Sequence, residues 1–215
     1  MRPGRMRRRQ FVRDGLLVAA GALLPLPAAA QRAPQWAEIH ELSGEVLLDG
    51  RPIGRNAAIQ AGQRLVTGRD GRIWFTLAGD AYFLRPGSEL RLRGFPGRDT
   101  LIEALRLITG ALGATFARGP RRSVVADTVT IGIRGTGVYV ATGPGETYAC
   151  TCFGTTQLYS RASGSMMEGI AVSAENHVAR RITGERIVPA GLEGHSSEEI
   201  ARLESLAGRP DPFRR

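Results

Sequence analysis

Residues 127–142, DTVTIGIRGTGVYVAT, contain the most regular pattern in the chain and decide its fold class. Val129, Ile131 and Ile133 are apolar and alternate with threonine and glycine. This two-residue period is typical of a β-strand with one buried face. Gly135 and Gly137 follow directly, and glycines at such positions indicate a bulge or the close approach of another backbone. The stretch therefore predicts a strand.

The same period recurs upstream, between turn signals. Asp49-Gly50 is a strong hairpin signal, and Asp70-Gly71 and Pro86-Gly87 mark further turns. Short strands separated by such turns predict an all-β fold. The apolar residues that alternate with polar ones in these segments are Ile73, Phe75, Leu77, Leu90 and Leu92.

Residues 101–116, LIEALRLITGALGATF, fit two structures. Thr100 and Glu103 would form the capping box of a helix. As a strand, the segment would bury Leu105 and Leu107 poorly by alternation alone. Spacing does not decide between the two.

Downstream, residues 146–160 and 168–177 predict two more strands. On the first of them, Tyr148, Cys150 and Cys152 share one face because alternate side chains of a strand point the same way. The end of the chain differs, because Ser196 and Glu199 form a capping box. We expect a short C-terminal helix that closes the β domain, with its apolar stripe formed by Ile200, Leu203 and Leu206.

Residues 1–30 predict a secretory signal peptide. An arginine-rich start precedes the apolar run LLVAAGALLPLPAAA, which is shorter than the roughly 20 residues that span a bilayer. Ala28 and Ala30 fit an A-x-A cleavage site. An uncleaved anchor is the alternative, and the short apolar run argues against it. We expect a mature chain that begins near Gln31, lies in the bacterial periplasm and has no stable membrane span.

Arg8, Arg9 and Phe11 resemble the twin-arginine export motif, which carries folded proteins and often their cofactors. Arg7 departs from that pattern, because a serine or threonine usually precedes the pair. Ordinary secretion also tolerates several arginines, so both routes stay open.

The net charge of +9 does not indicate nucleic-acid binding. Residues 1–30 hold six arginines and one acid, so the rest of the chain carries 23 basic and 19 acidic residues, a net of +4. We find no catalytic motif and no credible acid/base pair, so we expect no enzyme.

Residues 43–92, with their G-x-V opening, VTGRDG and PGSEL, resemble the FecR domain family, and IGIRGTGVYV at 131–140 resembles its later motif. The resemblance covers roughly residues 40–160. It implies an all-β domain, sandwich-like or solenoid-like, without a catalytic constellation. The best-known members are membrane-spanning regulators that sense a loaded outer-membrane receptor and control a sigma factor. Here about 15 residues precede the apolar run, so we expect no cytoplasmic regulatory region.

The predicted organisation is a signal peptide (1–30), a FecR-like β domain (31–190) and a C-terminal helix with its tail (191–215). The predicted function is non-enzymatic binding of an envelope protein or a small ligand, with a role in signalling related to metal uptake. One alternative is a metal-binding or redox-active envelope protein. Another is a structural module of an envelope assembly.

The metal alternative depends on Cys150 and Cys152, the two cysteines of the chain. Residues i and i+2 of a flat strand lie about 6.6 Å apart, at the far edge of disulfide geometry. Two thiolates on one face can instead take two corners of a zinc or iron site, with His177 and His195 as further ligands. Packing as two buried free thiols is the third interpretation, and spacing leaves all three open.

Arg134 is the polar residue of an otherwise apolar strand. One interpretation is that it binds an anion or a carboxylate. The other is structural, with its guanidinium paired to backbone carbonyls or to an acidic neighbour. The sequence favours the structural role, because buried arginines are usually paired.

Overall fold

The computed structural model describes residues 37–214 except 96–97 and 165–168, and gives no side-chain detail for 98–101. The predicted export signal, with Arg8, Arg9, Phe11, Ala28 and Ala30, lies outside the described residues. The described part contains fifteen strands and one helix, which confirms the prediction of an all-β fold with a short C-terminal helix.

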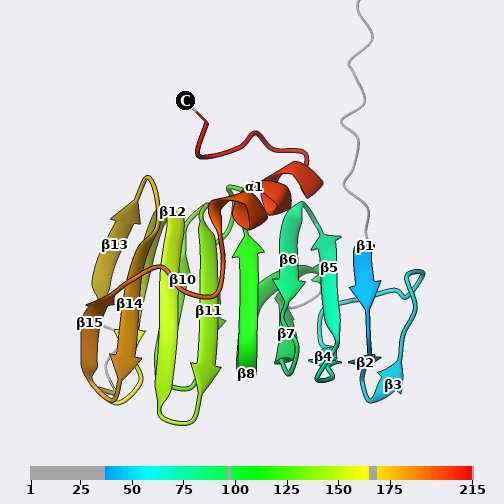
Figure 1. The fold of residues 1–215 in the computed structure, drawn as a ribbon, viewed down its shortest axis with the longest axis horizontal. Coiled ribbons are helices and arrows are strands. Elements are labelled where there is room, and N and C mark those ends of the chain that lie inside the picture. Colours follow the sequence, from blue (N-terminus) through cyan, green and yellow to red (C-terminus); the bar gives the residue numbers. More distant parts are fainter. Residues whose placement is uncertain (1–36, 96–97, 165–168, 215) are drawn as a thin grey trace, which may run out of the picture. The chain divides into compact units, whose positions relative to one another are not determined.

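The strands form two hydrogen-bonded sheets, A and B, that share two long strands, β8 and β12 (Figure 1). Neighbouring strands are antiparallel except β8 and β9, which are parallel. Sheet A runs in the order β15 (Arg186–Ala190), β14 (Val178–Thr183), β12 (Glu146–Ser160), β11 (Gly137–Gly143), β8 (Arg98–Thr115), β6 (Asp80–Leu84), β5 (Arg72–Leu77) and β1 (Glu38–Ser43). Sheet B contains β3 (Arg51–Pro52), β2 (Val46–Leu48), β4 (Arg64–Thr67), β7 (Glu89–Phe95), β9 (Arg122–Val125), β10 (Val129–Ile133) and β13 (Ile170–Ala174), with the other halves of β8 and β12.

Each long strand changes sheet near a glycine with positive φ. Gly110 has φ +81° and Gly154 has φ +82°. Left-handed φ values are accessible to glycine without strain, so glycine permits these bends. Before Gly110 strand β8 pairs with β7 and β9, and after it with β6 and β11. The strand alternative for residues 101–116 is therefore correct, and the bend explains why simple alternation failed there.

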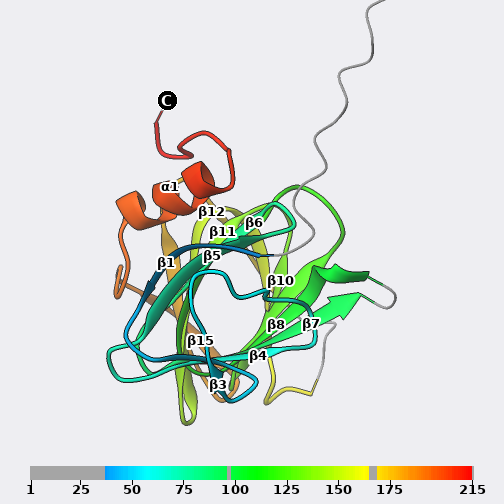
Figure 2. The same ribbon diagram turned by 90° about the vertical axis from the view of Figure 1, so that its right-hand side faces the viewer.

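The principal core lies between the two sheets, as the end-on view in Figure 2 shows. Val129, Ile131 and Ile133 all point into it and are at most 5% exposed, as their alternation predicts. Gly137 lies at a register shift between β11 and β12, and a Cβ there would meet the Phe153 ring at 2.4 Å. This confirms the predicted bulge with close approach.

Helix α1 (Ser197–Leu206) packs on part of the outer face of sheet A, so the strands beneath it are covered on both faces (Figures 1 and 2). Ser196 and Glu199 form the predicted capping box. Ile200 and Leu203 pack on a second apolar cluster that includes Trp74. Burial of Trp74 departs from the one-sided alternation expected for its strand, because the helix covers the face that the pattern assigned to solvent. The described residues hold no helix long and apolar enough to cross a membrane.

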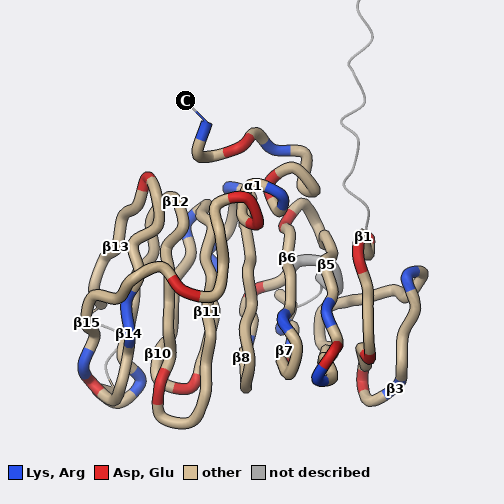
Figure 3. The backbone as a smooth tube through the Cα atoms, in the orientation of Figure 1, with Lys and Arg blue, Asp and Glu red and all other residues tan. Residues whose placement is uncertain are grey.

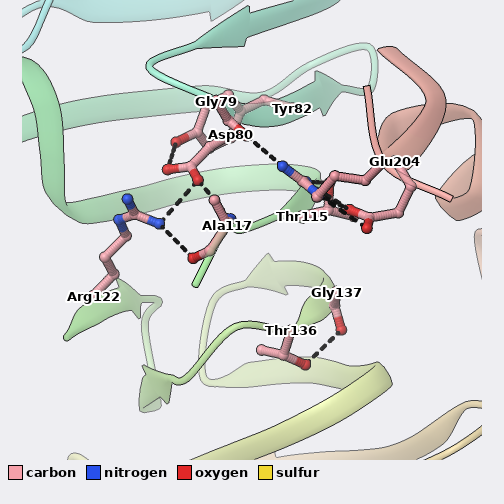
Figure 4. A network of polar contacts seen from close by, with 10 residues as sticks. Gly79, Asp80, Tyr82, Thr115, Ala117, Arg122, Thr136, Gly137 and Glu204 are labelled. Atoms are coloured by element: carbon pink, nitrogen blue, oxygen red, sulfur yellow. Dashed lines mark hydrogen bonds and ion pairs between the residues drawn. The ribbon is translucent and has the colours of Figure 1, made fainter. Parts of the chain in front are cut away.

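Acidic and arginine residues are interspersed along the chain (Figure 3), and one ion pair is buried. Asp80 is 1% exposed and accepts hydrogen bonds from Arg122 at 2.9 Å, from the amide of Ala117 at 2.9 Å and from the hydroxyl of Tyr82 at 3.1 Å (Figure 4). Burial raises the pKa of Asp80 to about 6, although these partners each lower it. Beside this pair, Arg209 joins Glu204 to the Thr115 hydroxyl, which fixes the end of α1 to sheet A.

We predict that Asp80→Asn lowers the free energy of unfolding by about 1–3 kcal/mol, because an asparagine amide has one acceptor oxygen where Asp80 uses two, so a hydrogen bond from Arg122, Ala117 or Tyr82 is lost. The folded pKa of about 6 exceeds the unfolded value of 3.8, so the folded state binds more protons between these values. The contribution of this carboxyl to stability therefore falls as pH rises through that window.

Urea denaturation at several pH values tests both statements. The stability difference between the protein and Asp80→Asn should be smaller at pH 7 than at pH 4. Asp70→Asn, at an exposed aspartate, is the matched control. Equal effects of the two substitutions, or a pH-independent difference, would contradict the prediction.

Candidate metal centre

Cys150 and Cys152 lie on the half of β12 that belongs to sheet A, and both face the cluster beneath α1. They are 1% and 0% exposed. Tyr148 shares their face, as predicted. Both cysteines are free thiols in this structure, so the disulfide that the sequence left open is not formed here.

Two loops bring the histidines to this strand. His177 lies in the turn between β13 and β14, and its backbone N–H donates to the Cys152 carbonyl at 3.0 Å. Its φ of +40° is left-handed, a conformation that costs a residue with a side chain about 1–3 kcal/mol. His195 lies between β15 and α1, directly before the N-cap Ser196. The side chains therefore come from three separate segments.

One ligand atom from each of Cys150, Cys152, His177 and His195 lies within 4.8 Å of the other three. The Cys150 Sγ is 3.6 Å from His177 Nδ1, and the Cys152 Sγ is 3.4 Å from His195 Nε2. The two imidazole nitrogens, His195 Nε2 and His177 Nδ1, are 3.2 Å apart. The structure thus brings all four predicted ligands together.

These separations match the edges of a tetrahedron around one metal ion. With Zn–S bonds of about 2.3 Å and Zn–N bonds of about 2.0–2.1 Å, a sulfur and a nitrogen ligand lie about 3.6 Å apart, and two nitrogens about 3.3 Å apart. The separations of 3.6, 3.4 and 3.2 Å fall close to these values. Three of the six separations thus match a mononuclear site, and the other three are at most 4.8 Å.

The other nitrogen of each histidine has a partner outside this group. His195 Nδ1 lies 2.8 Å from the Glu193 carbonyl, which can only accept, so Nδ1 donates the proton and Nε2 is the nitrogen that faces the cysteines. His177 Nε2 lies 3.0 Å from the Ser197 hydroxyl. Metal-binding histidines almost always have such an outer contact, which fixes the ring orientation.

Aromatic rings enclose the two imidazoles. Tyr139 stacks on His195 with 4.3 Å between ring centroids, and Phe213 stacks on His177 at 5.1 Å. Gly194 allows the first contact, because a Cβ there would lie 2.6 Å from the Tyr139 hydroxyl oxygen. The rings limit water access to the group.

The two thiols titrate very differently. The neighbouring Cys152 thiol, together with His195 and His177, lowers the pKa of Cys150 to about 5 against the opposing effect of burial. Burial raises the pKa of Cys152 well above its usual value, and the sulfur of Cys150 adds to that rise. The protein alone therefore favours one thiolate that is hydrogen-bonded to one thiol.

Sequence reasoning found the four central residues but missed their supports. Ser197, Tyr139, Phe213 and the Glu193 carbonyl have no spacing signal, because only the fold brings them to the histidines. Arg134 lies apart from the group, just after β10. It is exposed and makes no hydrogen bond or ion pair with another described residue, and its role stays a prediction.

No protein-family model matches the chain, and no curated protein matches it. Two crystal structures of a proposed anti-sigma factor from Parabacteroides distasonis are similar in part. One has 10% identity and a TM-score of 0.49 over 66% of this chain and 64% of the solved chain. The other has 9% identity and a TM-score of 0.48 over 60% of each chain. Both matches cover less than two thirds of the solved chains, and agreement this low says nothing about function. The FecR resemblance stays a prediction.

Proposed function

We propose that this protein is a metal-binding β protein that holds one zinc ion at Cys150, Cys152, His177 and His195. The observation that carries the proposal is the convergence of four ligand atoms, three of them from buried residues, with three separations of 3.2–3.6 Å and none above 4.8 Å. Without a cation, His195 Nε2 and His177 Nδ1 would face each other at 3.2 Å and could share only one proton between them. A metal ion accepts all four donors at once.

Zinc fits this ligand set better than an iron–sulfur cluster. Tetrahedral sites with two sulfur and two nitrogen ligands are typical of zinc. In a two-iron cluster with such ligands, the cysteines and histidines bind different irons. That arrangement would separate sulfur from nitrogen by more than the 3.4 and 3.6 Å found here. A single ion is therefore the better occupant.

The proposed site is structural rather than catalytic. Four protein ligands complete a tetrahedral shell, whereas a catalytic zinc keeps one position for water or substrate. The ligands join strand β12 to the segment that leads into α1. We infer that the ion fastens the tail segment, residues 191–214, to the outer face of sheet A. A ten-residue helix is not stable alone, so its position depends on such contacts.

We predict one equivalent of zinc in protein purified without chelator or affinity tag. Cys152→Ala and His195→Ala should each lose most of it, because three remaining ligands leave an open position in a buried site. Elemental analysis with a thiol count under denaturing conditions measures this. Lowering the pH should release the zinc, because protons compete for thiolate and imidazole.

His40→Ala is the matched control, because His40 is the third histidine of the chain and contacts Thr76, away from the group. It should retain the full equivalent of zinc. Metal-free protein with two titratable thiols would refute the proposal. Zinc that persists in both ligand variants would place it elsewhere in the chain.

A second prediction concerns the tail segment. Removal of the metal should speed tryptic cleavage after Arg202 by more than about tenfold, because structural zinc contributes strongly to local folding. Mass spectrometry of the fragments locates the cuts, and restoring zinc should restore protection. Tail cleavage that is equally slow with and without metal would show that the apolar contacts of Ile200 and Leu203 suffice.

We further propose that the protein works in the periplasm as a non-enzymatic binding domain, which the pattern of residues 1–30 supports. Replacing both Arg8 and Arg9 by lysine should abolish export if the route is twin-arginine. Fractionation and N-terminal sequencing measure the outcome, and the unchanged chain should begin near Gln31. An intact Met1 in the membrane fraction would contradict cleavage, and unchanged export of the variant would indicate ordinary secretion.

A further inference from the structure

A second polar cavity lies at one end of sheet B, whereas the candidate metal centre lies on the outer face of sheet A. Its volume is about 420 Å³, within the usual range for small-molecule sites. Three arginines line it and no aspartate or glutamate does. The lining residues that matter here are Arg121, Arg122, Gly132, Arg134, Gln157 and Tyr159.

Strand register brings these residues together. Ile133 at the end of β10 lies opposite Arg122 of β9 on one side and Thr156 of β12 on the other. Arg121 directly precedes Arg122, and Arg134 directly follows Ile133. Both arginines therefore lie at the same end of the sheet. The pairing of strands β9 and β10 therefore fixes the positions of the three arginines relative to one another.

The charges in this cavity are only partly neutralised. Arg122 is buried and pairs with Asp80, and its Nε has no hydrogen-bond partner in the described structure. Arg121 and Arg134 are exposed, and neither makes a hydrogen bond or an ion pair with another described residue. Two positive charges thus remain at the mouth of the cavity. A phosphate group carries about −1.5 to −2 at neutral pH, which matches them.

The neutral lining suits the same ligand. Tyr159 adds a hydroxyl beside the arginines, and the amide nitrogen of Gln157 donates to the Gly169 carbonyl at 3.0 Å, which holds that side chain in the wall of the cavity. Gly132 contributes only backbone, so it leaves space on the face that Gln157 shares. Arginine binds phosphate oxygens through two parallel hydrogen bonds. The volume exceeds that of one phosphate group, so a small organic moiety has room beside it.

We propose that this cavity binds the phosphoryl group of a small molecule or of a lipid headgroup, with Arg121 and Arg134 as its principal contacts. In this proposal, Arg134 of the stretch IRGTG binds phosphate, and this role is independent of the metal site. Arg134 supplies the charge, and Gly132, on the preceding strand, supplies the space.

Isothermal titration of the full protein with inorganic phosphate, at constant ionic strength in chloride, tests the proposal. We expect saturable binding that weakens at least about tenfold in both Arg121→Gln and Arg134→Gln, because each substitution removes charged hydrogen-bond donors to the phosphate. Arg186→Gln, at an exposed arginine of β15 that does not line the cavity, removes the same charge and should leave binding unchanged.

A variant that changes shape without charge gives a second test. Gly132→Val should fold, because a Cβ at this position would have its nearest neighbour at 3.5 Å, an ordinary contact. It should block phosphate by filling the cavity. Sedimentation with phosphatidylglycerol vesicles, against phosphatidylcholine vesicles, distinguishes a lipid headgroup from a free phosphate compound as the source.

Three outcomes would overturn the proposal. These are no saturable phosphate binding, equal losses in Arg134→Gln and Arg186→Gln, and preference for succinate over phosphate. None of them bears on zinc content, so failure here and failure of the metal site are distinguishable.

Discussion

The bend of strand β12 at Gly154 is the constraint on which the rest of the structure depends. Left-handed φ at this glycine lets one strand serve two sheets. A Cβ there would lie 2.9 Å from the side chain of Thr136, so a larger residue would be both strained and crowded. On one side of the bend, the strand presents Cys150 and Cys152 under α1. On the other side, it presents Gln157 and Tyr159 to the arginine-lined cavity. The bend at Gly154 therefore separates the half of β12 that carries the two cysteines from the half that lines the arginine-lined cavity.

Partial cover of sheet A by α1 is the second determinant. An antiparallel sheet usually leaves one face to solvent, but here α1 packs on the part of the outer face that holds Cys150 and Cys152. This cover turns Cys150 and Cys152 into buried ligand atoms and brings His195 to them, since His195 immediately precedes the helix. The helix is in turn held by charged contacts at both ends, through Arg85 with Glu199 and Arg209 with Glu204. Helix position and site geometry thus depend on each other.

Local patterns in the sequence predict what is local in the structure. The alternation of Val129, Ile131 and Ile133 and the capping box at Ser196 need only near neighbours, so both were predictable. Residues 101–116 were not, because Gly110 changes the sheet, and hence the buried face, in the middle of the strand. The four metal-site residues could be named because cysteine and histidine are rare in this chain. Their supports could not, since the contact of Ser197 with His177 arises only when α1 is docked.

Two of the edge strands, β3 of sheet B and β15 of sheet A, each contain a proline, Pro52 and Pro189. Proline has no amide hydrogen, so it cannot donate to an added strand, and arginine side chains flank both strands with charge. These two borders therefore resist edge-to-edge aggregation, a hazard for any chain with so many strands. Recognition of another macromolecule through strand addition is disfavoured at both borders, which leaves side-chain surfaces as the means of contact there.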